Sequence, residues 1–175
     1  MSKKNKLQIL SVRVEHKLDE DPDTSYLGKF TDDAMENAIV RVGDNRGKFV
    51  REIGDGELPT KGREFRFFLP AMTGEETGSP ESPQQDWQRM EALNDGHWHF
   101  IGIIAKAEIR NPQTSCVQTI HSGGVWGIES DSSPEYFVEA ESDQLAQLKA
   151  ELLALSNGVG ERAIAYAIKH AIRPN

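Results

Sequence analysis

The first predicted strand lies at residues 6–18, where apolar and polar residues alternate in the manner of a half-buried strand. The aliphatic residues expected on its buried face are Leu10, Val12 and Val14. The same alternation predicts a further strand at residues 63–69, with one face formed by Phe65, Phe67 and Leu69. Short apolar runs at residues 39–53 flank a Gly-Asp-Asn-Arg-Gly sequence and indicate a hairpin.

A longer alternating pattern predicts a β-hairpin at about residues 97–121. The apolar residues that would share one face of its first strand are Ile101, Ile103, Ala105, Ala107 and Ile109. Asn-Pro-Gln-Thr at residues 111–114 is typical of a tight turn, and residues 115–121 would form the return strand. Cys116, on the return strand, is expected to be a small buried residue.

A helix is predicted to follow Ser82, which is a suitable N-cap. Pro83 would occupy the first helical position and Gln85 has the spacing of a capping box. Gly96 would end the helix in the left-handed conformation. The apolar face of this helix would consist of Trp87, Met90 and Leu93.

Two more helical patterns follow. A leucine seam, with spacings of three, four and three residues, comprises Leu145, Leu148, Leu152 and Leu155. Ser142 is a suitable N-cap for this helix, and the Ser-Pro pair at residues 133–134 indicates a shorter turn before it. A final helix of small apolar residues is expected from Ala163 to Ile172, ended by Pro174.

The order of these elements, mostly strands first and helices afterwards, predicts an α+β fold. We expect an antiparallel sheet packed by about two to four helices. Residues 1–175 would form a single domain, because the chain is short for two. A loop rich in Gly, Pro, Ser and Glu at about residues 73–83 is expected to be mobile, and would divide an N-terminal subregion, residues 1–72, from the rest.

Charge and composition narrow the classes of function. The chain has 20 Lys and Arg against 28 Asp and Glu, a formal net charge of −8. Direct binding to DNA or RNA is disfavoured, because phosphate neutralisation supplies much of the affinity of nucleic-acid binders. No membrane span and no secretory signal are expected. A single cysteine, which cannot form an internal disulfide, favours the cytoplasm.

Three histidines offer a candidate metal site. His97 and His99 are two residues apart, so both would point to the same face of a strand. His121 on the return strand, with Asp131, could complete a set of imidazole and carboxylate ligands. This pattern suggests a metal-dependent hydrolase or nuclease as the alternative function. Surface histidines where a helix meets a strand are the favoured explanation, since no HExxH or paired-cysteine spacing is present. No cofactor is expected in that case.

The most distinctive segment, residues 111–148, contains no Lys or Arg. We interpret its glycines as providing positive φ angles, and Trp126 with Ile128 as core residues that anchor the segment. A solvated acidic face, with acids favoured at helix starts, is one interpretation of its charge. The other is steering of a basic partner, for which the candidate contacts are Glu129, Asp131, Glu135, Glu139, Glu141 and Asp143.

Four strings resemble a group of uncharacterised small proteins of phage, prophage and plasmid sequences. They are DPDTSYLG at 21–28, QDWQRMEALNDGHW at 85–98, FIGI at 100–103 and GGVWGIESD at 123–131. The likeness extends from about residue 10 to Leu155, and the GGxWGIESD motif is its most specific part. The group has no established activity, so the resemblance assigns no site residues. It implies a mobile-element context, in which accessory proteins often act on host defence or replication machinery.

The sequence thus predicts a non-enzymatic accessory protein of a mobile genetic element that binds a basic surface of a host protein. The favoured target is a nucleic-acid-binding defence complex, inhibited in the anti-CRISPR or anti-restriction manner. A third expectation is self-association through the leucine seam of Leu145, Leu148, Leu152 and Leu155.

Overall fold

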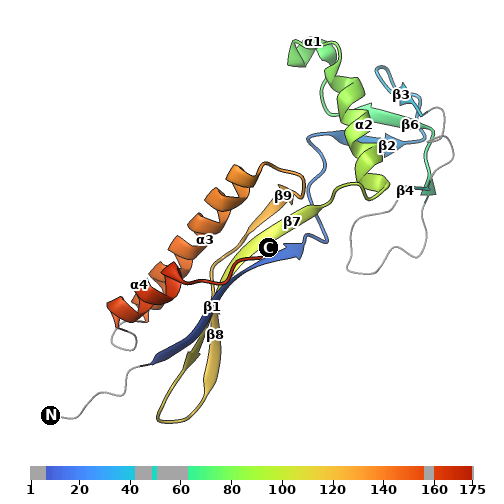
Figure 1. Ribbon diagram of the computed structural model, residues 1–175. Helices are drawn as coiled ribbons and strands as arrows, with labels where there is room; N and C mark the ends of the chain where they lie inside the picture. Colours follow the sequence, from blue (N-terminus) through green and yellow to red (C-terminus); the bar gives the residue numbers. More distant parts are fainter. Residues whose placement is uncertain (1–6, 42–48, 51–62, 156–159, 175) are drawn as a thin grey trace. The chain divides into compact units, whose positions relative to one another are not determined.

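The computed structural model describes residues 7–41, 49–50, 63–155 and 160–174. They form an α+β fold of antiparallel sheets and helices, which confirms the prediction of fold class (Figure 1). The chain divides into two compact units: the first consists of Met1–Leu18 and Ile101–Asn175, and the second of Asp19–Phe100. The second unit is therefore an insertion in the sequence of the first. The segment at 73–83, expected to divide the chain, lies inside this insertion.

The first unit is built on a sheet with strand order β1-β7-β8, in which β9 also pairs with β7. The strands are β1 (Gln8–Leu18), β7 (Phe100–Arg110), β8 (Val117–His121) and β9 (Val125–Glu129). β7 and β8 are antiparallel, with Lys106 opposite His121 and Arg110 opposite Val117. The predicted hairpin is thus confirmed, and the five residues expected on one face of β7 are all buried.

A β-bulge near the start of β1 changes which residues face the core. Ile9 pairs with Ile109 and Ser11 pairs with Glu108, so Leu10 is the extra residue between them. This insertion shifts the alternation of side chains by one position. Ile9 therefore packs against the core, whereas Leu10, predicted to be buried, is exposed.

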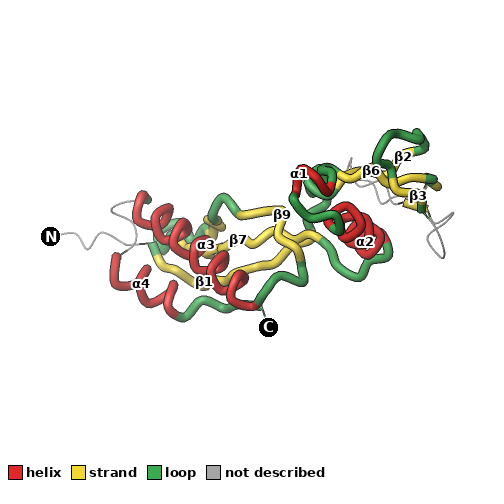
Figure 2. Tube along the Cα trace, turned by 90° about the horizontal axis from the view of Figure 1, so that it is seen from above, coloured by secondary structure: helices red, strands yellow, loops and turns green. Residues whose placement is uncertain are grey.

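Helices α3 (Pro134–Ala154) and α4 (Glu161–Lys169) cover one face of this sheet (Figures 1 and 2). The core between the two layers is aliphatic and consists of Val12, Val14, Ile101, Ile103, Ala105, Ala107, Ile109, Ile128, Leu145, Leu148, Leu152 and Ile164. In the part of the chain that the structure describes, no helix is both long and apolar enough to span a membrane.

One helix replaces the two elements predicted for residues 133–155. Ser133 is the N-cap of α3 and its hydroxyl accepts a hydrogen bond from the backbone N–H of Tyr136. Ser142, predicted to be the cap, lies inside the helix and donates to the carbonyl of Val138. Both serines have the side-chain chemistry of an N-cap. The apolar face of α3 continues back toward Ser133, so the helix begins there and not at Ser142.

The C-terminal helix is shorter than predicted. α4 ends at Lys169, and the chain beyond it runs beside β1, where Ile172 and Arg13 form a parallel bridge. Two hydrogen bonds hold this segment, from the N–H of Val14 to the carbonyl of Ile172 and from the N–H of Ile172 to the carbonyl of Val12. Pro174 thus lies beyond a strand-like segment instead of ending a helix.

The second unit has a small sheet of strand order β2-β6-β3. It comprises β2 (Gly28–Thr31), β3 (Ile39–Val40) and β6 (Phe67–Pro70), and β4 (Phe49–Val50) pairs separately with β5 (Arg63–Glu64). Helices α1 (Gly74–Thr77) and α2 (Ser82–Asn94) follow. The core consists of Leu27, Phe68, Trp87, Met90, Trp98 and Phe100.

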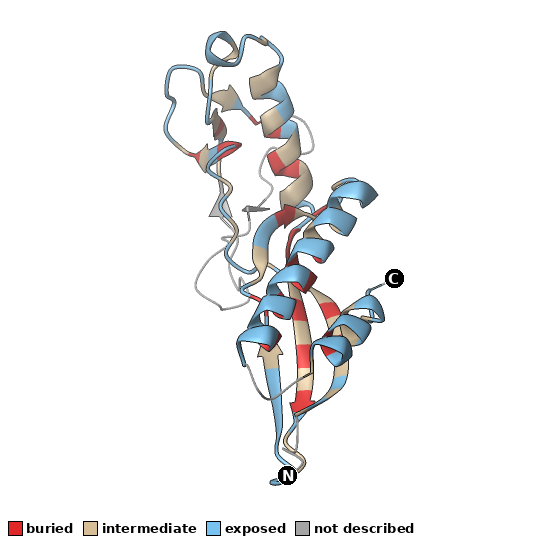
Figure 3. Ribbon diagram, turned by 90° about the vertical axis from the view of Figure 1, so that its left-hand side faces the viewer, coloured by how far each residue is buried: buried red, intermediate tan, exposed pale blue. Residues whose placement is uncertain are grey.

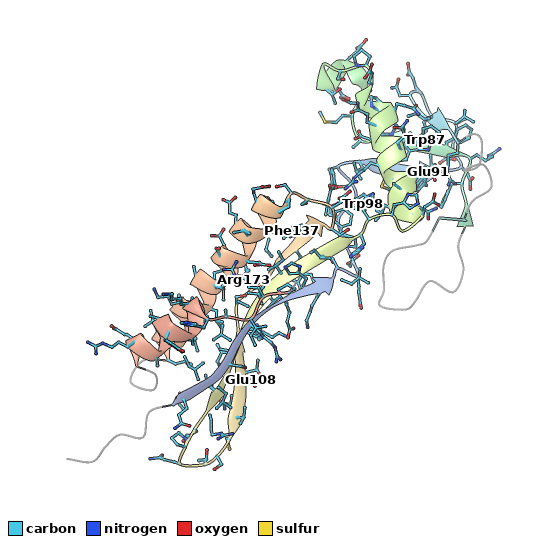
Figure 4. All side chains as sticks on the ribbon, in the orientation of Figure 1. Trp87, Glu91, Trp98, Glu108, Phe137 and Arg173 are labelled. Atoms are coloured by element: carbon cyan, nitrogen blue, oxygen red, sulfur yellow. The ribbon has the colours of Figure 1, made fainter. Side chains whose placement is uncertain are left out.

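A buried ion pair links Arg41, the residue after β3, to α2 in this unit. The Arg41 guanidinium donates to the Glu91 carboxylate through Nε and Nη2, with Nη2 to Oε2 at 2.9 Å. Its Nη1 donates to the carbonyl of Phe65. Trp87 Nε1 donates to the same carboxylate at 2.9 Å, and Figure 4 shows Trp87 and Glu91 on α2. Removing either charged partner would leave the other buried and unpaired, which makes this contact structurally important.

Several local expectations for this unit need correction. The buried aromatic residue of β6 is Phe68, not its neighbours on the opposite face. α2 begins one residue earlier than expected, with Glu81 as its N-cap and no side-chain cap bond, although Gly96 has the expected positive φ of 77°. The expected loop at 73–83 contains helix α1, which Thr73 caps. Most of the predicted hairpin at 39–53 lies outside the described residues.

Candidate functional site

The outward side of α3 carries three of the predicted contact residues. Glu135, Glu139 and Asp143 are exposed and four residues apart, so they form one line along the helix. No ion pair joins any of the three to another described residue. Tyr136 and Val138, 49% and 55% exposed, lie on either side of this line. Figure 3 shows the exposed outer side of α3 in pale blue. We call these five residues the acidic face of α3.

Glu141 does not belong to the acidic face, although the sequence predicted it as a contact. It is buried, and its carboxylate lies 3.0 Å from Nε2 of His16 and 3.0 Å from Nη1 of Arg173. Phe137 stacks on His16 with ring centroids 5.7 Å apart. Phe137 and Arg173 are labelled in Figure 4. Glu141 therefore ties α3 to β1 and to the C-terminal segment, and its burial removes its carboxylate from the surface that a partner would contact.

The first two predicted contacts lie just before α3. Glu129 is the last residue of β9 and is half-buried, and Asp131 is exposed in the turn that follows. Both interact with other residues of the chain. They border the acidic face but have intramolecular roles that Glu135, Glu139 and Asp143 lack.

The tryptophan of the GGVWGIESD motif packs on a glycine of a neighbouring strand. Trp126 on β9 lies against Gly102 of β7: a Cβ atom at Gly102 would come within 2.2 Å of Cε3 of the indole. Trp126 was expected in the core, but 47% of it is exposed. Ile128 is buried, as predicted. Because Gly102 alternates with Ile101 and Ile103, the indole covers the sheet face opposite the helices.

The turn between β8 and β9 is held by polar contacts that replace sheet hydrogen bonds. The N–H of Ser122 donates to the carbonyl of Ala105, and the N–H of Ala105 donates to the hydroxyl of Ser122. Gly124, at a φ of 80°, donates its N–H to Oε1 of the buried Gln144 on α3 at 3.0 Å. These contacts satisfy backbone groups that would otherwise be buried without partners.

The sheet face opposite the helices carries cations that are paired within the sheet. Glu15 lies 2.6 Å from Nζ of Lys106 and 2.8 Å from Nε of Arg13. The hydrogen bond from Lys106 is the main cause that lowers the pKa of Glu15 below its ordinary value. Arg13 also approaches Glu108 at 3.7 Å. Arg13 and Lys106 thus each have a carboxylate partner on this face.

The residues of the alternative metal site do not form a cluster. His97 and His99 are exposed residues of the second unit, whereas His121 and Asp131 belong to the first. Nowhere in the described ranges do three or more His, Cys, Asp or Glu side chains lie close enough together to hold a metal ion. Cys116, predicted to be buried, is exposed in the hairpin loop.

The leucine seam is mostly used inside the chain. Leu145, Leu148 and Leu152 are buried against the sheet, and only Leu155 remains exposed, at 40%. The packing of α3 on its own sheet therefore occupies the surface that was expected to serve self-association.

Sequence reasoning missed the polar residues on the inner side of α3. Glu141, Gln144 and Leu148 are spaced three and four residues apart, so two polar side chains continue the leucine stripe. Such residues on an apolar stripe require buried partners, and this was the signal that could have identified them.

The chain was compared with protein families, curated proteins and solved structures. No protein-family model matches it, and neither a curated protein nor a solved structure is significantly similar to it.

Proposed function

We propose that the protein is a binding module whose acidic face of α3 engages a basic surface of a partner protein. The single observation that carries this proposal is the line of Glu135, Glu139 and Asp143, which are exposed and have no cationic partner among the described residues. A basic partner surface supplies the missing counter-charges and is steered toward this face over distances of about 10 Å. Tyr136 and Val138 add apolar contact area beside the charges.

The position of these acids on the helix supports a role in binding. Acids in a first turn are stabilised by the helix dipole, which accounts for Glu135. Glu139 and Asp143 lie one and two turns further on, where that stabilisation has faded. Each pair of like charges four residues apart destabilises a helix by about 0.2–0.5 kcal/mol. The arrangement thus opposes folding slightly and is explained by a partner.

The class of partner follows from charge and context. A line of carboxylates competes with nucleic-acid phosphates for Lys and Arg side chains, so nucleic-acid-binding proteins are the favoured targets. The resemblance of the GGVWGIESD motif to proteins of phage and plasmids adds a mobile-element setting. Inhibition of a host defence complex of the CRISPR or restriction type, by occupation of its nucleic-acid site, is the specific form of the proposal.

Charge reversal on α3 tests the proposal. Tagged protein is used as bait in host cells, and bound proteins are identified and measured for affinity with wild type and with Glu135→Lys/Glu139→Lys/Asp143→Lys. We expect a loss of affinity of about 10- to 1000-fold, because attraction becomes repulsion at three positions. Wild-type binding should also weaken as salt rises from about 0.05 to 0.5 M.

A matched variant separates local from overall charge. Glu20→Lys/Glu36→Lys/Glu75→Lys changes the net charge equally, and all three residues are exposed and outside α3. This variant should keep the partner within about threefold of wild-type affinity. Equal losses in both variants, or no loss in the α3 variant with its thermal stability intact, would contradict the proposal.

A further inference from the structure

We propose that the chain forms a homodimer by antiparallel pairing of β8 with β8 of a second copy, which joins the two sheets into one. The proposal goes beyond the binding role of α3, because β8 and the acidic face belong to different elements. It rests on three features of β8: the direction of its backbone groups, the absence of charge along this edge, and its exposed side chains.

The backbone of β8 presents a regular free edge. In the sheet formed by the described residues, β8 pairs only with β7. The carbonyl of Cys116 accepts from Asn111 and the N–H of Ser122 donates to Ala105, so even-numbered residues direct their backbone groups toward β7. Val117, Thr119 and His121 consequently direct theirs outward, in the pattern that an added strand requires.

This edge lacks the features that normally prevent pairing. Charged residues make up 27% of the chain, yet residues 111–128 contain no Asp, Glu, Lys or Arg. Edge strands are usually protected by charges, proline or bulges. In β9, Gly127 has a φ of 76°, a conformation typical of a bulge. β8 has no charged residue, no proline and no shift in its register with β7. Val117, 51% exposed, and the exposed Thr119 lie on the sheet face opposite the core.

A second copy is the partner that fits an uncharged edge. Two molecules with a net charge of −8 repel each other at most surfaces, and a symmetric dimer places each surface against itself. The repulsion is smallest where the contact carries no formal charge, which is the case along β8. A basic partner, by contrast, gains nothing at this edge. Pairing centred on Thr119 includes every residue of β8, because Val117 then lies opposite His121 of the second copy.

Mass measurement across concentration tests the dimer. Light scattering and sedimentation of the full chain up to about 0.5 mM should show twice the monomer mass of 19.5 kDa, with a dissociation constant on the order of 10–100 µM. Thr119→Lys places two like charges opposite each other and should leave a monomer. Gln113→Lys adds the same charge in the hairpin loop and should keep the dimer. A wild-type monomer throughout, or a dimer that survives Thr119→Lys or is lost equally in Gln113→Lys, overturns the proposal.

Cross-linking tests the register independently of any change in stability. Thr119→Cys in a Cys116→Ser background should form a disulfide-linked dimer under mild oxidation, because paired residues lie about 5 Å apart. The natural Cys116 should not, since the two copies would lie about 20 Å apart along the strands. Thr119→Cys should cross-link more than tenfold faster than the natural Cys116. A smaller difference in rate contradicts pairing centred on Thr119.

Discussion

At the scale of single residues, the position of Trp126 in the GGVWGIESD motif depends on Gly102, a residue of β7 outside the motif. The indole occupies the space that a side chain at position 102 would need, so residue 102 must lack a Cβ atom. Gly124 also lies close to the indole, with its ideal Cβ 3.1 Å from Nε1. The sequence singled out Trp126 and the glycines beside it, but nothing in the local pattern indicates that Trp126 meets Gly102, which is distant in sequence.

Gly102→Ala should therefore destabilise the fold by about 1–3 kcal/mol, because the added methyl group and the indole cannot occupy the same space. Urea unfolding measures the change in free energy, and intrinsic fluorescence should change as Trp126, one of three tryptophans, is displaced. Gly123→Ala is the matched control, since its nearest neighbour, Oε1 of Gln147, would lie at an ordinary 3.8 Å. Equal stability of the two variants would show that Trp126 leaves Gly102 without cost.

At the scale of elements, α3 shows how packing chooses between equal local signals. Ser133 and Ser142 both have the chemistry of an N-cap, and the sequence favoured Ser142 for the leucine-rich helix. The inner side of α3 remains in contact with the sheet from Phe137 to Leu152. This burial extends the helix back to Ser133, and it moves Asp143 from a first turn to the middle of the helix.

Ser133→Ala should cost about 1 kcal/mol of stability, because the N–H of Tyr136 loses its acceptor. Ser142→Ala should change stability by less than about 0.5 kcal/mol, since alanine is the better residue inside a helix. Thermal unfolding of both variants measures the difference. A larger loss for Ser142→Ala than for Ser133→Ala would mean that the helix begins at residue 142 after all.

At the scale of the whole molecule, the second unit interrupts the first between two paired strands. Leu18 at the end of β1 lies opposite Ile101 in β7, so the chain leaves the first sheet and returns to it at adjacent positions. The inserted unit has its own aromatic core around Phe68 and Trp98. Each unit thus buries its own apolar residues, which is the physical requirement for folding alone.

Replacing residues 19–100 by Asn-Gly should therefore give a folded protein, because a two-residue turn joins directly opposed antiparallel residues. Circular dichroism with urea unfolding should show helix, strand and one cooperative transition. Leu148→Asp in the same shortened chain is the control and should unfold it, since Leu148 is fully buried. Non-cooperative unfolding of the shortened chain would mean that the first unit needs the second.

The sequence alone determined the α+β class, the hairpin of β7 and β8, and the buried face of β7. These depend on periodic patterns of neighbouring residues, which the local backbone geometry converts directly into structure. Only the tertiary structure decided that Glu141 is buried against His16 and Arg173, and that Trp126 lies on Gly102. These contacts join residues far apart in the chain, and nothing in the local spacing specifies them.

For the candidate site, the sequence located the acidic segment. The fold then determined which of its acids are exposed and which are used within the chain. Glu135, Glu139 and Asp143 face outward, Glu141 faces inward, and Glu129 and Asp131 interact within the chain. The direction of each side chain depends on where α3 begins and which side packs on the sheet. Charge content is therefore a property that the sequence fixes by itself, whereas the surface that this charge forms exists only after α3 has packed.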